Sequence, residues 1–127
     1  MATPFEQAQA DLHLTPQERN LYESHLANLW GSGGVNNPDG SRSTVLNVTT
    51  GIDGKYYVLP TVYDGRILQL DDAVDRAAKL GLDTFPSYAS PEEAEQRYEA
   101  MHNYMQQDTA EWIRRNRSDL SNSILSR

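Results

Sequence analysis

The sequence contains no cysteine, which excludes a disulfide framework and any metal site built from thiolates. No apolar run approaches the roughly 20 residues of a membrane-spanning helix, so we expect no membrane partner. The N-terminus lacks a basic region followed by a hydrophobic stretch, and we therefore expect no export by a standard signal.

Basic residues are scarce, with 11 Lys and Arg against 18 Asp and Glu and a net charge of −7. Direct binding to DNA or RNA needs clustered cations that displace counterions, so we expect none. Residues 114–127 hold four arginines and one aspartate, which leaves −10 for residues 1–113. A basic segment on an acidic body favours docking on an acidic surface or on another copy of the chain. A simpler interpretation is that Arg114 and Arg115 stabilise a helix C-terminus.

The length of 127 residues indicates a single domain, and the low hydrophobic fraction of 38% predicts a thin core. We divide the chain into an N-terminal arm (1–14), one α+β domain (15–115) and a flexible basic tail (116–127). The arm is either frayed or a short helix, because its few apolar residues follow no firm start pattern. The predicted fold is a β-hairpin or three-stranded meander packed with three helices, the last of them long.

The first firm helix start is Thr15-Pro16-Gln17-Glu18. Thr15 and Glu18 can bind each other's backbone amides, and proline suits the first helical position. Apolar residues then recur at helical spacing until Gly31 ends the helix. The glycine-rich residues 31–43 predict a loop without regular structure.

Residues 44–52 and 55–62 are rich in β-forming residues, and Asp53-Gly54 between them predicts a tight hairpin turn. The resulting register is described by its facing pairs: Ile52 with Lys55, Thr50 with Tyr57, Val48 with Leu59, and Leu46 with Thr61. The opposite surface carries Val45, Tyr56, Val58 and Val62. Both faces are partly apolar, so we expect one of them to meet a partner. A second turn at Asp64-Gly65 predicts a third strand at 66–68.

Asp71 is predicted to be the N-cap of a second helix that stops at Gly81, and residues 82–88 are expected to be extended. Ser90-Pro91-Glu92-Glu93 predicts the start of a third helix that reaches about Arg115. The inner stripe of this helix is Ala94, Tyr98, Met101, Met105 and Trp112. Asp108 interrupts the stripe, so either the helix leaves the core there or its far end contacts something else.

The sequence offers no convincing catalytic or metal site. His13, His25 and His102 lack the spacing of a metal-binding pair. The glycine-rich loop precedes a strand, whereas a phosphate cradle needs a following helix. The acidic residues of 64–75 are explained by a turn and a helix start. We therefore expect no enzyme activity, no cofactor and no metal.

The remaining candidates are partner-binding residues. Tyrosine and tryptophan are favoured at protein interfaces, because they bury large areas with few rotatable bonds. On the hairpin and on the long helix, the candidate interface residues are Tyr56, Tyr57, Val58, Trp112, Arg114 and Arg115.

The order of turns and helix starts resembles a small domain that recurs in virion-associated and internal virion proteins of tailed bacteriophages and in prophage proteins. The matching groups are Asn37-Pro38-Asp39-Gly40-Ser41 with Ser43-Thr44, Asp53-Gly54 with Pro60-Thr61, Asp64-Gly65-Arg66 with Asp71-Asp72-Ala73, and Ser90-Pro91-Glu92-Glu93-Ala94. The similarity covers about residues 15–112. The aromatic pair Tyr56-Tyr57 departs from the pattern. The resemblance implies assembly or delivery work and supplies no catalytic residues.

Three functions follow as hypotheses. The leading one is a virion structural protein, that is a connector, a decoration or an ejected internal component. It would bind a larger phage structural protein or copies of itself, and would be found in the virion and, during assembly, in the host cytoplasm. The second is an acidic inhibitor of a host defence or of a nucleic-acid-binding system. The third is an accessory module of peptidoglycan degradation.

Overall fold

The computed structural model describes the backbone of residues 2–125 and the side chains of residues 2–116. Its helices are α1 (Pro4–Leu12), α2 (Pro16–Trp30), α3 (Leu70–Leu80) and α4 (Pro91–Leu125), with a single 3₁₀ turn η1 (Leu82–Thr84). Its strands are β1 (Val35–Asn36), β2 (Arg42–Ser43), β3 (Val48–Ile52), β4 (Lys55–Leu59), β5 (Val62–Tyr63), β6 (Arg66–Ile67) and β7 (Ser87–Tyr88). The predicted α+β class is confirmed.

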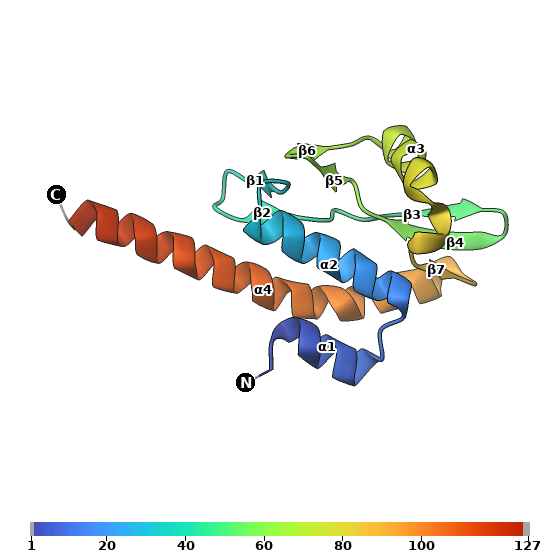
Figure 1. Cartoon of the computed structure of the whole chain (residues 1–127), viewed down its shortest axis with the longest axis horizontal. Coiled ribbons are helices and arrows are strands. Elements are labelled where there is room, and N and C mark those ends of the chain that lie inside the picture. Colours follow the sequence, from blue (N-terminus) through green and yellow to red (C-terminus); the bar gives the residue numbers. More distant parts are fainter. Residues whose placement is uncertain (1, 126–127) are drawn as a thin grey trace.

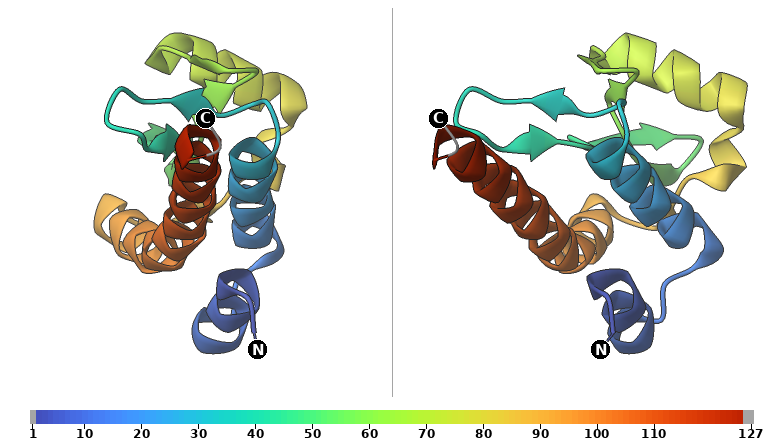
Figure 2. Two further views of the ribbon diagram at one scale, coloured as in Figure 1. Left: turned by 90° about the vertical axis from the view of Figure 1, so that its left-hand side faces the viewer. Right: turned by 60° about the vertical axis from the view of Figure 1, so that its left-hand side comes forward.

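The elements form layers around the β3–β4 hairpin. Helices α2 and α4 lie side by side beneath the strands, α1 packs against α4 from below, and α3 crosses the opposite side (Figures 1 and 2). The C-terminal part of α4 runs well beyond the other elements (Figure 1). At 1.5 Å per residue, its 35 residues span about 52 Å.

The N-terminal arm forms a short helix, α1, and is not frayed. Its start, Thr3-Pro4-Phe5-Glu6, is a complete capping box in which Thr3 accepts from the Glu6 amide and Glu6 reaches back to the Thr3 amide. Ala8 and Leu14 are buried in the main core. Residues before Thr15 therefore belong to the packed domain rather than to a separate arm. The same box, predicted at Thr15 and Glu18, is confirmed at the start of α2.

The hairpin register is confirmed from Ile52 opposite Lys55 to Val48 opposite Leu59. Asp53 and Gly54 have the positive φ angles, 51° and 79°, that a two-residue turn of this kind requires. The predicted pairing of Leu46 with Thr61 is wrong. Leu46 has a φ of 42° and leaves the extended conformation, so the Thr61 amide donates to the Val45 carbonyl at 2.8 Å instead.

The third strand of the main sheet is β7, which pairs with β4, and not residues 66–68. The Asp64-Gly65 turn does form, but it joins β5 to β6 in a separate two-stranded ladder. Residues 31–43, predicted as an irregular loop, contain the short β1–β2 ladder. Local turn residues fix where the chain reverses, but they do not select which strand pairs with which.

The hairpin surface that carries Tyr56 and Val58, two of the predicted interface residues, is the core face. Val58 and Val45 are 1% and 2% exposed, and Tyr56 packs against the same cluster. Leu59, on the other face, is fully buried, and β4 also contacts α3 on that side. Both faces of β4 are thus covered by this chain, because the helices of the described residues divide between the two sides of the sheet (Figure 1).

Helix α3 departs from the prediction at its start, and helix α4 departs from it at its C-terminal end. Helix α3 begins at Leu70 with Gln69 as its N-cap, so Asp71 lies in the first turn instead of capping it. Gly81 ends α3 as predicted, with a φ of 107° that favours glycine. Ser90 accepts from the Glu93 amide at the start of α4, as predicted. The helix continues to Leu125 rather than Arg115. The predicted flexible tail (116–127) falls largely on residues whose side chains lie outside the described part.

Candidate functional site

A cleft of about 400 Å³ lies between helix α4 and the loop that includes β2. This volume lies within the range of small-ligand and peptide pockets. Its walls combine hydroxyl, amide, imidazole, guanidinium and apolar side chains: His25, Asn37, Ser41, Arg42, Ser43, Thr44, Val45, Leu46, Tyr98, His102, Met105, Gln106, Thr109, Ala110 and Ile113. None of these residues carries a carboxylate, although the chain as a whole is acidic.

Arg42 supplies the permanent positive charge of the cleft. Its Nε donates to the Asn28 carbonyl at 3.1 Å, its Nη2 to the Gly31 carbonyl at 2.7 Å, and its Nη1 to the Asn36 side chain. All three acceptors are neutral, and among the described residues Arg42 forms no salt bridge. The guanidinium therefore holds a fixed position at the C-terminal end of α2 without a carboxylate partner, and it retains N–H donors that these bonds do not use.

Two neighbours keep Arg42 in place. Its guanidinium carbon lies 5.4 Å from the centroid of the Trp112 ring, within the range of a cation–π contact. Gly34 allows the arginine to approach α2, because a Cβ built on Gly34 would lie 2.7 Å from Arg42 Nε and 2.6 Å from the Asn28 carbonyl oxygen. A larger residue at position 34 would displace the guanidinium.

Leu46 stands at the mouth of the cleft with 46% of its surface exposed. Its φ of 42° is costly for a leucine, by about 1–3 kcal/mol. The Thr61 hydroxyl donates to the Leu46 carbonyl at 2.6 Å and fixes this conformation. An exposed apolar side chain on a strained backbone is a feature of binding sites.

A buried polar network forms the floor of the cleft. The Tyr22 hydroxyl donates to Asp108 Oδ2 at 2.6 Å, and His25 Nε2 lies 3.3 Å from the same oxygen. His25 Nδ1 lies 2.6 Å from the Thr44 hydroxyl oxygen. Burial and the bond to Asp108 raise the pKa of Tyr22, so its hydroxyl stays protonated as a donor. Asp108 is thus part of the core, so the alternative in which the helix leaves the core at this residue is wrong.

The order hydroxyl, imidazole, carboxylate in Thr44, His25 and Asp108 is also found in hydrolases. Here, however, the carboxylate faces Nε2 and the hydroxyl faces Nδ1, which is the reverse of the hydrolase arrangement. His25 is only 1% exposed, and the residues of Thr44 and Asp108 are each 8% exposed. We interpret the network as a structural connection that joins α2 and α4 to the loop.

His102 lies at the cleft edge, where its ring stacks on Tyr98 with 5.6 Å between centroids. Burial lowers the pKa of His102, and the nearby His25 lowers it further. Burial also raises the pKa of Tyr98 to about 12. Both rings are therefore neutral near pH 7, and Arg42 remains the permanent cation of the cleft.

The six predicted interface residues do not form one site. Val58 is buried and Tyr56 packs on the core, so neither belongs to a free surface. Tyr57 is half-buried on the other face of the hairpin, in a hollow next to Pro86. The other three lie far along α4, and there Trp112 contacts Arg42.

Arg114 and Arg115 are exposed on α4, and both pair with Glu111, Arg115 at 3.0 Å. The Arg115 guanidinium also lies 5.1 Å from the Trp30 ring centroid, at the end of α2. Trp30 remains 48% exposed. The simpler interpretation of two arginines at a helix C-terminus is wrong, because the helix continues past them. Both arginines remain exposed, and Arg115 lies beside the exposed Trp30.

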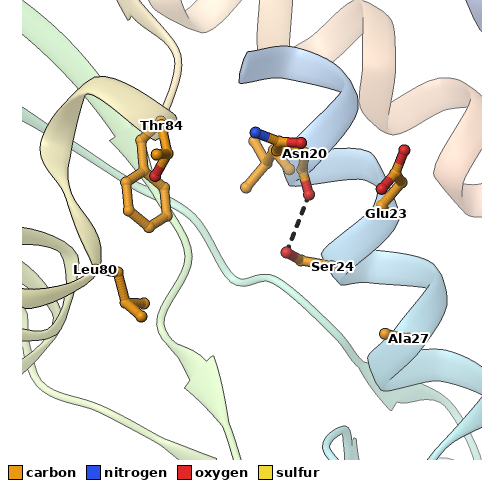
Figure 3. A pocket seen from close by; sticks show the side chains of 8 residues that line it. Asn20, Glu23, Ser24, Ala27, Leu80 and Thr84 are labelled. Atoms are coloured by element: carbon orange, nitrogen blue, oxygen red, sulfur yellow. Dashed lines mark hydrogen bonds between the residues drawn. The ribbon is translucent and has the colours of Figure 1, made fainter. Parts of the chain in front are cut away.

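A second hollow, between α2 and the α3–η1 segment, is less suited to recognition (Figure 3). Ser24 donates its hydroxyl hydrogen to the Asn20 carbonyl of its own helix at 3.0 Å. Leu80 and Ala27 line its apolar side, and Leu80 is 56% exposed. Few polar groups in this hollow converge on one point, in contrast to the cleft beside α4.

Within the described residues, no group of three or more histidine, aspartate or glutamate side chains is placed to hold a metal ion. Over the same part of the chain, none of the helices combines the length and apolarity needed to cross a membrane.

The sequence signals for the cleft were partial. The loop 37–44 forms one wall of the cleft, but no local pattern of residues places it against α4. Asp108, noted as an interruption, marked the position of the buried network. Comparison of the chain with protein-family models, curated proteins and solved structures gave no match.

Proposed function

We propose that the chain is a virion-associated structural protein of a tailed bacteriophage that works by binding a larger phage protein. It serves as a connector, a decoration or an ejected internal component. The proposal includes no catalytic step, cofactor or metal. The assignment to a phage virion rests on the resemblance of the turn and helix-start groups. The assignment of a binding role rests on the geometry of the chain.

The binding role is supported mainly by the length of helix α4, which exceeds the diameter expected of the domain. A compact chain of this length has a radius of gyration of about 14 Å, which for a solid sphere corresponds to a diameter of about 36 Å, whereas α4 spans about 52 Å. Its C-terminal part leaves the other elements behind (Figure 1). Helices in proteins gain most of their stability from packing against other elements, so this end is expected to pack against another macromolecule.

Exposed apolar side chains give a second line of support. The large hydrophobic residues that are about half exposed are Trp30, Leu46, Ile67, Leu70 and Leu80. Two of them, Trp30 and Leu46, flank the region where α4 meets α2 and the cleft. Apolar and aromatic groups rimmed by polar residues are typical of protein interfaces.

The inhibitor alternative has weaker support. A nucleic-acid mimic needs carboxylates arrayed without cations, but Asp64 pairs with Arg76 and Glu111 pairs with two arginines. Exposed glutamates without such partners gather mainly in the first turns of α4, at Glu92, Glu93, Glu95 and Glu99.

Mass spectrometry of purified particles tests the proposal. Phage particles are induced from a host that carries the gene, banded on a density gradient and washed at high salt. We expect peptides of this chain at constant stoichiometry to the major capsid protein across the particle peak. Absence from particles that contain all other structural proteins would contradict the structural role.

A further inference from the structure

We propose that the cleft between α4 and the loop 37–46 binds an extended acidic peptide segment of the partner protein, with a carboxylate at Arg42 and an apolar side chain against Leu46. This inference rests on the proposed function, because it names the chemistry of the partner that the virion protein would bind.

The charge pattern selects an anion. Arg42 is the cleft's permanent cation and forms no salt bridge among the described residues, while no carboxylate lines the cleft walls. The nearby Asp39 is engaged by the Ser41 amide and hydroxyl, and Asp108 lies below the floor, bonded to Tyr22. A partner carboxylate would supply the missing counter-charge and could accept the arginine's unused N–H groups.

The shape selects an extended chain over a compact small molecule. The cleft adjoins another hollow, which lies beside the N-terminal half of α4 and has a volume of about 600 Å³. The cleft and this hollow share Leu46, Tyr98 and His102. Together the two hollows follow α4 from Pro91 to Ile113, which is about 33 Å of helix. An extended peptide rises about 3.3 Å per residue and can follow such a groove.

The two ends of this groove differ in charge, and this difference determines at which end the acidic residue of the peptide binds. Glu95 and Glu99 line the hollow near the start of α4, whereas Arg42 lines the far end. The partner's carboxylate is therefore placed at the Arg42 end, away from the two glutamates. Leu46 lies between the ends, and Ile113 offers further apolar surface at the Arg42 end.

The test uses NMR titration of the isotopically labelled full chain with the peptide acetyl-Leu-Glu-Leu-Glu-amide. The uncharged reference peptide is acetyl-Leu-Gln-Leu-Gln-amide, and NMR detects affinities down to the millimolar range. We expect the acidic peptide to shift the backbone amides of Ser43, Leu46 and Gln106, and the reference peptide to bind at least about threefold more weakly. Added salt should weaken binding of the acidic peptide only.

A matched pair of variants locates the site. Gln106 and Gln107 are both exposed on α4, but only Gln106 lines the cleft. Gln106→Glu places a carboxylate in the cleft wall and should weaken binding of the acidic peptide about threefold or more, whereas Gln107→Glu, with the same net charge, should not. Both substitutions leave buried residues untouched, so both variants should fold.

The outcomes separate this inference from the proposed function. If the acidic peptide causes no shifts at millimolar concentration, shifts residues outside the cleft, or binds no better than its amide counterpart, the inference is wrong. Detection of the chain in purified particles would leave the virion role standing in that case. If the peptide binds as expected but the chain is absent from particles, the cleft is a peptide site and the virion role fails.

Discussion

Arg97 on α4 holds the buried carboxylate of Glu18 on α2 through two nitrogen atoms, with 2.9 Å from Nε to Oε2 and 2.7 Å from Nη2 to Oε1. The same carboxylate accepts from the Thr15 amide at 3.0 Å and from the Tyr88 hydroxyl at 2.7 Å. Arg97 also donates to the Leu12 carbonyl. One carboxylate thus closes the capping box of α2 and connects it to β7 and α4.

Substitution of Arg97 by leucine should destabilise the fold strongly. Glu18 is 1% exposed, and removal of its partner leaves a buried charge uncompensated. Because Arg97 itself is partly exposed, we expect a loss of about 3 kcal/mol in the free energy of unfolding, the lower end for a broken buried pair. Urea denaturation measures it. The control Arg76→Leu breaks an exposed pair with Asp64 and should cost about 1 kcal/mol or less.

The contribution of Glu18 should depend on pH. Burial raises the pKa of Glu18. The hydrogen bonds from Arg97, Thr15 and Tyr88 lower the pKa by more than burial raises it, so the net pKa lies below the usual 4.5. A folded-state pKa below the unfolded value stabilises the fold above the unfolded pKa, and this stabilisation disappears as the pH falls through the folded pKa.

The difference in unfolding free energy between the unmodified chain and Glu18→Gln should therefore narrow as the pH falls from about 6 to about 3. Urea melts at a series of pH values measure this difference. A gap that stays constant across the range would show that the pKa of Glu18 is the same in the folded and unfolded states.

Removal of the Tyr22 hydroxyl tests the buried network. Tyr22→Phe leaves Asp108 Oδ2 without its 2.6 Å hydrogen bond in the core, and we expect a loss of about 1–3 kcal/mol. Tyr104→Phe is the matched control, because Tyr104 donates to Asp11 at the surface. This exposed bond should contribute less than about 0.5 kcal/mol. Equal losses in the two variants would mean that Asp108 is solvated.

The reassigned hairpin face gives a fourth prediction. Val58 is 1% exposed, so Val58→Lys would bury an unpaired ammonium group and should abolish cooperative folding. Its cross-strand partner Thr49 points to the same face but is exposed. Thr49→Lys should change stability by about 0.5 kcal/mol or less. Circular dichroism melts compare the thermal stability of the two variants. A Val58→Lys variant that still folds cooperatively would show that this face is not part of the core.

The starts of α2 and α4 and the hairpin register could be predicted, because they depend on residues close in sequence. Thr15 and Glu18 lie three positions apart, and Asp53-Gly54 alone sets which residues of 48–59 face one another. The start of α1 repeats the pattern of α2 at Thr3-Pro4-Phe5-Glu6, and the same argument applied there predicts that helix. Local hydrogen bonds determine all three features.

Long-range pairings could not be predicted in the same way. The β7 strand pairs with β4 from about thirty residues further along the chain, and no local pattern distinguishes it from residues 66–68. Asp108 is buried because Tyr22 and His25 on α2 offer it partners 86 and 83 residues away. The cleft depends on the same packing, since its walls come from segments far apart in sequence.

Photo-crosslinking inside assembled particles tests the central claim most directly. A photoreactive amino acid replaces Gln106 in the cleft wall or, in a parallel sample, Gln7 on α1, which is exposed and lies outside the cleft. Irradiation of particles that carry the Gln106 replacement should link this chain to one larger virion protein, through an acidic peptide identified by mass spectrometry. The Gln7 replacement should give little of that product. Particles that lack the chain, or equal products from both positions, would contradict the account.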